Sequence, residues 1–266
     1  MNARCKATRY SRLNTIFMQN IIETLVNMSN TLGDEAYDYA ILGEGNTSAK
    51  LDEQHFLVKA SGTQLGTIDA NGFVKVQFSP ILEALEQESL TDTEVKDVLL
   101  GSTVDNEAKR MPSVETFLHA IILSQEGIEY VGHTHPTAIN SILCSKKAEE
   151  AVSGCLFPDQ IVVLGTDPLF IPYTDPGLVL AKAVQVGFAD YIAHFGKAPR
   201  ATYMQNHGFI AAGKTEKDVV KITQMAVKTA KVVLGTYMLG GPNFFSDEHV
   251  NRIENRPDEK YRRTVI

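Results

Sequence analysis

The spacing of apolar residues changes repeatedly between helical and strand periods, and this change restricts the fold more than any other feature of the sequence. Helical spacing predicts long or medium helices over 14–32, 113–125, 176–195 and 216–238. Between them lie short strand-like runs that often follow one another through tight polar turns. Strands joined by tight turns pair antiparallel, so we expect an α/β fold of three α/β/α layers with a mixed, mainly antiparallel central sheet.

The remaining elements are predicted from short patterns. Strands are expected over 39–42, 47–51, 55–60, 73–76, 128–132, 161–164, 169–171, 201–206 and 209–212. We also expect one helix led by Pro80, another over 136–144, and a surface loop over 90–111. No linker or repeat interrupts the pattern, which predicts a single domain over 1–266 with a loosely ordered basic arm (1–13) and charged tail (240–266).

Composition excludes several classes of partner. The formal net charge of -7 argues against a protein that binds nucleic acid through bulk electrostatics. No apolar run approaches the ~20 residues that span a bilayer, so no membrane partner is expected. Cys5, Cys144 and Cys155 are odd in number and widely spaced, which predicts inert thiols in a reducing cytoplasm.

A pair of histidines is the first candidate site. His133 and His135 follow a predicted strand, and side chains two residues apart in a strand project to the same face. Two neutral imidazoles held in this way can bind one transition metal, most commonly zinc. Pro136 then pre-sets the first turn of a helix. The spacing alone fits two ordinary hydrogen-bonded histidines equally well.

Further polar stretches offer candidate partners for this pair. Glu115, at a predicted helix start, can be a helix cap, a metal ligand or a base that transfers protons. His207 is followed by a glycine that leaves room for a ligand, although a lone histidine is more often structural. The turns at 45–48 and 59–63 contain glycine, serine and asparagine, and such turns can offer donors to a phosphate, although most bind nothing.

These stretches together form an ordered set of motifs. Gly-Asn-x-Ser, Lys-x-Ser-Gly, Pro-Ser-x-Glu, His-x-His-Pro and Asn-His-Gly occur in this order between residues 43 and 213. The set resembles the class II aldolase/adducin family and is far more specific than any one motif. Within that family, residues 43–48 and 157–165 are most similar to the aldolase-like portion of bifunctional rhamnulose-1-phosphate aldolase/dehydrogenase proteins.

The resemblance implies a metal site and a substrate site. It implies one Zn²⁺ per subunit, with Glu115 as fourth ligand in the resting site and as the catalytic acid/base group once substrate displaces it. The implied histidine ligands are His133, His135 and His207. The residues that fall where family members hold the substrate phosphate are Gly45, Asn46, Ser61, Gly62 and Ser113.

The resemblance also implies an activity and an assembly. The implied enzyme is a zinc-dependent lyase that cleaves a ketose phosphate by retro-aldol chemistry to dihydroxyacetone phosphate and an aldehyde. Zinc in such enzymes polarises the carbonyl and hydroxyl oxygens and stabilises the enediolate. Family members are typically cyclic tetramers, so a cytoplasmic homotetramer with sites between subunits is expected.

Two departures from the family pattern keep other functions open. Val114 stands where fuculose-type aldolases commonly have a second serine, and no tyrosine near 157–159 matches their proton donor. Lys59 is a candidate cation that compensates for Val114 beside the Ser61-Gly62 turn, and it fits a solvated lysine of a strand equally well. The alternatives are a zinc-dependent sugar-phosphate epimerase, dehydratase or decarboxylase, or a non-catalytic adducin-like interaction module. His119 shares a helix face with Glu115, and we interpret it as a supporting or core residue rather than a ligand.

Overall fold

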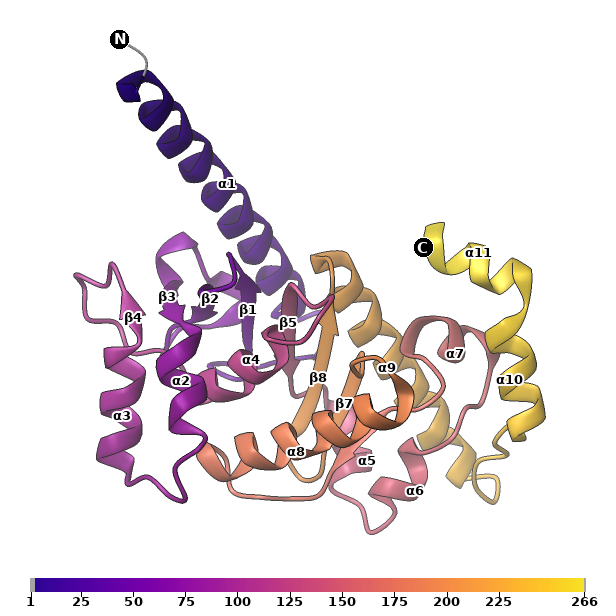
Figure 1. The fold of residues 1–266 in the computed structure, drawn as a ribbon. Coiled ribbons are helices and arrows are strands. Elements are labelled where there is room, and N and C mark those ends of the chain that lie inside the picture. Colours follow the sequence, from indigo (N-terminus) through magenta and orange to yellow (C-terminus); the bar gives the residue numbers. More distant parts are fainter. Residues whose placement is uncertain (1–2, 266) are drawn as a thin grey trace.

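The computed structural model describes the backbone of residues 3–265 and the side chains of residues 18–262. One sheet lies between two layers of helices (Figure 1). The strands are β1 (Asn46–Lys50), β2 (His55–Lys59), β3 (Phe73–Gln77), β4 (Thr103–Val104), β5 (Tyr130–Thr134), β6 (Leu169–Ile171), β7 (Ala201–Met204) and β8 (Gly208–Gly213). The helices are α1 (Ala3–Leu32), α2 (Phe78–Ala84), α3 (Asp92–Gly101), α4 (Thr116–Leu123), α5 (Thr137–Leu143), α6 (Ala148–Val152), α7 (Pro158–Leu164), α8 (Leu178–Phe195), α9 (Glu216–Tyr237), α10 (Asp247–Asn255) and α11 (Pro257–Val265), with short 3-10 turns at Leu65–Thr67 and Ala70–Gly72.

The sheet is mixed but mainly antiparallel, as predicted. Its order is β4-β3-β2-β1-β5-β8-β7-β6, and only β6 and β7 run parallel among the described strand pairs. In the middle of the sheet, His133 of β5 lies opposite Asn46 of β1 on one side and Ile210 of β8 on the other. This register brings three distant parts of the chain to one end of the central strands.

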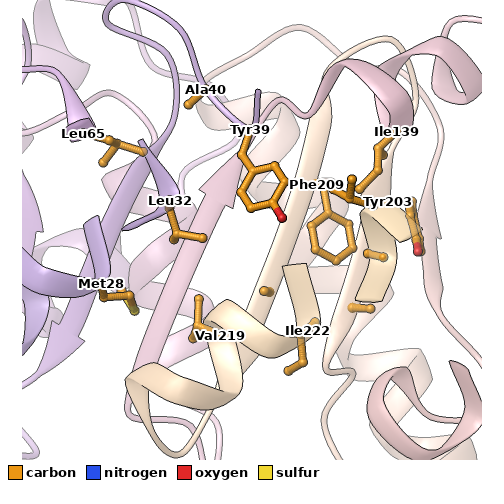
Figure 2. Packing of buried hydrophobic residues seen from close by; sticks show 14 of the residues in the cluster. Met28, Leu32, Tyr39, Ala40, Leu65, Ile139, Tyr203, Phe209, Val219 and Ile222 are labelled. Carbon is orange, nitrogen blue, oxygen red and sulfur yellow. The ribbon is translucent and has the colours of Figure 1, made fainter. Parts of the chain in front are cut away.

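One face of the sheet is covered by α1 and α9. Figure 2 shows Met28 and Leu32 of α1 packed near Val219 and Ile222 of α9 within one buried cluster. These residues recur at helical spacing, so each helix turns one apolar stripe toward the strands. A capping box between Thr215 and Asp218 begins α9.

The opposite face is covered by α2, α4 and α8 (Figure 1). Buried Phe117 of α4 and Phe188 of α8 pack there with Ile210 of β8. Among the described helices, α8 alone is long and apolar enough to count as a weak candidate for a bilayer span. Its buried residues Leu180 and Val184 belong to this cluster, so α8 packs one face against the sheet.

The central strand β1 is polar although it is buried. Thr47 and Ser48 are both fully buried, and each side chain has a partner on a different face of the sheet. Thr47 Oγ1 lies 2.6 Å from Ser29 Oγ of α1, and Ser48 Oγ lies 2.6 Å from His119 Nδ1 of α4. Buried polar groups need such partners, so β1 is specified by its hydrogen bonds as well as by its packing.

Three predicted elements differ from the structure. The strand predicted over 39–42 is wrong, because Asp38 just before the segment and Leu42 at its end have φ of 57° and 51°, which an extended strand does not allow. The predicted loop over 90–111 contains α3 and β4, and a capping box of Thr91 and Glu94 begins α3. The strand predicted over 161–164 is the second half of α7, which has Pro158 at its first turn.

The other predicted strands and helices are present, with ends displaced by a few residues and with α1 beginning well before residue 14. Residues 1–2 of the predicted basic arm lie outside the described residues, and its backbone from Ala3 onward is helical. The predicted charged tail forms α10 and α11, which contact α7. Ile253 of α10 packs there against Cys155 and Ile161.

Candidate metal centre

The candidate ligands come from three neighbouring elements. His133 is in β5 and His135 follows it, while the turn between β7 and β8 carries His207. Because β8 pairs with β5, this turn places His207 beside the other two histidines. Glu115 lies at the N-cap of α4 and makes no side-chain capping hydrogen bond. The capping explanation for Glu115 is therefore not supported, and its side chain faces the histidines.

The four side chains converge at short distances. One ring nitrogen from each of His133, His135 and His207 lies within 4.8 Å of the other two. The Nε2 atoms of His133 and His135 are 2.9 Å apart. Glu115 Oε1 lies 3.0 Å from His207 Nε2 and 3.4 Å from His133 Nε2. Three imidazole nitrogens and one carboxylate oxygen therefore surround one point.

A second hydrogen bond sets the tautomer of His133. Its Nδ1 lies 3.0 Å from the Phe209 carbonyl oxygen, which can only accept, so Nδ1 carries the proton when the ring is neutral. The lone pair of Nε2 then faces His135 and Glu115. A backbone carbonyl behind a ligand histidine is the usual support in metal sites. The donor set of three imidazoles and a carboxylate fits zinc.

The charges in the site influence one another strongly. Burial by itself raises the pKa of a carboxyl group, but the imidazoles of His133 and His207 outweigh it and hold the pKa of Glu115 well below its ordinary value. Burial likewise lowers the pKa of His133, yet Glu115 outweighs it and the net shift is upward. Burial and the charges of His133 and His207 lower the pKa of His135 to about 3. The site thus contains an ionised carboxylate and a neutral imidazole, as metal binding requires.

Two glycines allow this close approach of strands. Gly45 has φ of 68°, and a Cβ there would lie 2.6 Å from the His133 carbonyl oxygen. A Cβ at Gly208 would lie 2.6 Å from Cδ2 of His135 and 2.7 Å from the Thr134 carbonyl oxygen. Both positions therefore require glycine for steric reasons.

Of the residues expected to hold a phosphate, some are buried beside Glu115 and others are exposed in a turn. Asn46 Nδ2 donates to Glu115 Oε2 at 2.5 Å and lies 3.4 Å from Ser113 Oγ. Ser61 and Gly62 are exposed, and the Ser61 N–H donates to the Met111 carbonyl oxygen. Gly45, Asn46 and Ser113 are thus close to Glu115, whereas Ser61 and Gly62 lie in the turn that pairs with the chain before Ser113.

The predicted cation Lys59 is nearby and buried. It is only 3% exposed, and its ammonium group donates to the Gly43 carbonyl oxygen at 3.3 Å. Burial lowers the pKa of Lys59, while the charge of Glu115 opposes this shift. The backbone of Lys59 also accepts a hydrogen bond from the Ser113 N–H, at 3.3 Å. Val114, by contrast, is 51% exposed and has no group that can donate to a phosphate.

Sequence patterns did not identify two further residues near His135. The His135 N–H donates to the Tyr39 carbonyl oxygen at 2.8 Å, and His135 Nδ1 lies 3.8 Å from Glu44 Oε1. Glu44 also accepts from the Ile41 N–H, which closes the loop before Gly45. The only sequence signal for Glu44 is its place between Gly43 and Gly45.

Comparison with known proteins agrees with this arrangement. Residues 23–234 match the family described as Class II Aldolase and Adducin N-terminal domain. The chain therefore belongs to the class II aldolase and adducin family, which confirms the resemblance drawn from its motifs. Members of this family are typically metal-dependent, and the three-histidine group is consistent with that property.

Two curated proteins are similar in sequence. "Uncharacterized oxidoreductase YuxG" of Bacillus subtilis is 28% identical over 218 residues, which are 79% of this chain but only 29% of that protein. The chain thus spans less than a third of the length of this relative. The "3-oxo-tetronate 4-phosphate decarboxylase" of Haemophilus influenzae is 24% identical over 230 residues, which are 85% of this chain and 93% of that protein.

Two solved structures are similar in fold. The N-terminal class II aldolase domain of a conserved protein from Thermoplasma acidophilum is 31% identical with a TM-score of 0.63, covering 80% of this chain and 93% of that one. An L-fuculose 1-phosphate aldolase is 20% identical with a TM-score of 0.66, covering 91% of this chain and 96% of that one. These neighbours confirm the predicted fold class.

Proposed function

We propose that this protein is a zinc-dependent lyase that cleaves a ketose phosphate by retro-aldol chemistry to dihydroxyacetone phosphate and an aldehyde. The observation that carries the proposal is the convergence of His133, His135 and His207 with Glu115. These four residues would hold one zinc ion per subunit. Bound zinc supplies a Lewis acid that polarises substrate oxygens.

The chain itself supplies the proton transfer. Glu115 is ionised and largely buried, and its Oε2 is held by Asn46. An ionised carboxylate at this position is suited to accept a proton from a substrate hydroxyl. Oε1, which faces His133 and His207, is the oxygen that would change partners when substrate binds.

A phosphate would bind on the side of Glu115 where Asn46 and Ser113 lie. Asn46 and Ser113 offer an amide and a hydroxyl there, and Ser61 and Gly62 offer donors in an exposed turn. Gly45 keeps the chain close to β5. Lys59 supplies a buried positive charge, which supports anion binding where Val114 offers no donor.

A second candidate function has a specific observation in its favour. The Haemophilus influenzae relative that covers most of this chain is a decarboxylase of a 3-oxo acid phosphate. The same metal and phosphate residues would serve decarboxylation, epimerisation or dehydration. A non-catalytic adducin-like module is the least supported alternative, because it has no need of three histidines and Glu115 around one point.

We further propose a cytoplasmic homotetramer with sites between subunits, in which residues 1–266 form a single domain. The single sheet and the family membership support this proposal. Small sugar phosphates, rather than nucleic acid or membrane, would be its partners, in keeping with the net charge of -7.

A panel assay tests the proposal. The zinc-loaded protein is given a set of ketose 1-phosphates and a set of 3-oxo acid phosphates, and release of dihydroxyacetone phosphate and of carbon dioxide is measured separately. Release of dihydroxyacetone phosphate that is lost in a His133→Ala, His135→Ala double variant supports the lyase. Release of carbon dioxide alone would replace the lyase with the decarboxylase, and turnover that persists in the double variant would contradict both.

A further inference from the structure

A chain of hydrogen bonds leads from Glu115 into the core. Asn46 Nδ2 donates to Glu115 Oε2, and on its other side the Asn46 Oδ1 atom contacts His119 Nε2. His119 Nδ1 lies 2.6 Å from Ser48 Oγ. His119, Asn46 and Ser48 are all at most 3% exposed, so each polar atom depends on the next for its partner.

The residues of this hydrogen-bond chain come from β1 and from the start of α4, and the two pairs have similar spacing. Asn46 and Ser48 are two residues apart in β1 and therefore face the same side of the sheet. Glu115 and His119 are four residues apart at the start of α4 and therefore face the same side of the helix. Both repeats are about 6–7 Å long, so the two pairs meet in register.

The direction of each hydrogen bond follows from the geometry of the Asn46 amide. Its nitrogen faces Glu115 Oε2 and lies 3.4 Å from Ser113 Oγ, so both of its N–H groups have an acceptor on that side. The amide oxygen of Asn46 then faces His119, and His119 Nε2 must carry a hydrogen. This holds whether the ring is neutral or charged. In the neutral ring Nδ1 is an acceptor, and the Ser48 hydroxyl donates to it.

We propose that His119, held by Ser48, is a positioning residue that fixes the amide of Asn46 with its nitrogen toward the site. Asn46 then holds Glu115 Oε2 and leaves Oε1 free to face His133 and His207. The second N–H of Asn46 points toward Ser113, where a substrate oxygen would bind. Only this last step rests on the proposed function; the orientation of Asn46 does not.

Neutron diffraction from a crystal of the wild-type protein exchanged into heavy water tests the orientation without any activity. We expect a deuteron on His119 Nε2 and two deuterons on the Asn46 atom that faces Glu115. An Asn46 oxygen toward Glu115, or a His119 Nε2 without a deuteron, would overturn the proposal. Either result leaves the lyase reaction to be decided by the panel assay.

A pair of variants tests the consequence for the site. His119→Gln places an amide N–H where Nε2 lies, whereas His119→Leu fills a similar volume without a donor. Loss of a residue that orients a ligand typically costs about 10–100-fold in metal affinity or activity. We expect a loss of this size in zinc affinity and in kcat for His119→Leu, with KM changed less, and recovery of most of it in His119→Gln.

A packing role for His119 predicts a different result. In that case the apolar His119→Leu would be at least as stable and active as His119→Gln, and this outcome would contradict the proposal. Ser48→Ala is a milder test. Its matched control is Ser102→Ala, at a buried serine that follows α3 and whose hydroxyl donates to the Leu99 carbonyl oxygen. We expect Ser48→Ala to lower zinc affinity and Ser102→Ala to leave it unchanged; zinc affinity is measured without substrate.

Discussion

At the scale of single residues, Glu115 is the side chain on which the proposed chemistry depends. A side chain that caps a helix with a hydrogen bond contributes about 1 kcal/mol, and the residues that do so are mostly Ser, Thr, Asp and Asn. Glu115 makes no such bond and instead faces His133 and His207. The start of α4 is instead supported by Ser113, whose Oγ accepts from the Glu115 N–H at 3.3 Å, so the carboxylate of Glu115 is available to the site.

Glu115→Gln removes this charge and keeps the shape of the side chain. We expect kcat to fall by about 10²–10⁴-fold, the usual contribution of general acid–base catalysis, and the protein to remain folded. Steady-state kinetics and the melting temperature measure the two effects. The exposed Glu126→Gln is the matched control and should leave both unchanged. A Glu115→Gln protein with undiminished kcat would remove Glu115 from the catalytic role.

Gly45→Ala tests how closely β1 and the site approach each other. Alanine at positive φ costs about 1 kcal/mol wherever it occurs. At position 45 it also meets the His133 carbonyl oxygen, whereas at Gly127, which has φ of 79°, it meets nothing. We therefore expect Gly45→Ala to lower the free energy of unfolding clearly more than Gly127→Ala in denaturant titrations. Equal losses of unfolding free energy in the two variants would show that β1 and β5 can move apart without loss of stability.

At the scale of elements, α5 supports the turn that carries His207. Asn140 Nδ2 donates to the His207 carbonyl oxygen at 3.1 Å, and the Asn206 N–H donates to the Leu143 carbonyl oxygen. Asn206 has φ of 53°, so the turn depends on these contacts for its shape. The position of His207 therefore depends on a helix that supplies no ligand.

Asn140→Ala removes the side-chain part of this support. We expect zinc affinity to fall about tenfold while the fold is kept, because His207 loses its fixed position. Competition with a chelator of known affinity measures the change. Ser141→Ala, one residue further on the exposed side of α5, serves as the control and should bind zinc like the wild type. Unchanged affinity in Asn140→Ala would mean that β7 and β8 hold His207 without α5.

The elements that the sequence predicted best are those with long or regular apolar spacing. The stripe Leu25, Met28 and Leu32 predicts α1 without tertiary information. The apolar run 161–164 is too short for its spacing to distinguish a strand from a helix. It is helical because Pro158 begins α7 three residues earlier. The segment 90–111, predicted as a loop, contains the capping pair Thr91 and Glu94. Such a pair, three residues apart, predicts the start of a helix.

The site could be predicted only in part. The spacing of His133 and His135 places them on one face, but His207 joins them because β8 pairs with β5, which is a long-range event. Ser48 carries no local signal, since a serine in a buried strand has no pattern that reveals its partner. His119 was visible at helical spacing from Glu115, yet its hydrogen bonds depend on how β1 packs against α4.

At the scale of the whole molecule, the last helices extend the structure beyond the sheet. α10 and α11 contact α7, and Arg262 forms an ion pair with Asp159. Exposed ion pairs contribute little, about 0–1 kcal/mol, so the apolar contact of Ile253 is the stronger link. The predicted charged tail is therefore attached through a small cluster of its own.

Ile253→Ala tests this attachment. Truncation of a buried isoleucine typically costs about 2–5 kcal/mol, and the small size of this cluster places the expected loss near the lower value. Denaturant titration measures the global loss, and hydrogen exchange measures the loosening of α10. Met238→Ala, at an 87% exposed position, is the control and should have little effect. No loss in Ile253→Ala would show that the tail is only loosely held.

The most direct test of the central claim is the metal content of the purified protein, compared with that of the His133→Ala, His135→Ala double variant. If His133, His135, His207 and Glu115 form a zinc site, the wild-type protein supplied with zinc binds one ion per chain and the folded double variant binds none. His194→Ala, at an exposed histidine, should bind like the wild type. A well-folded wild-type protein that binds no metal after zinc is supplied would contradict the account.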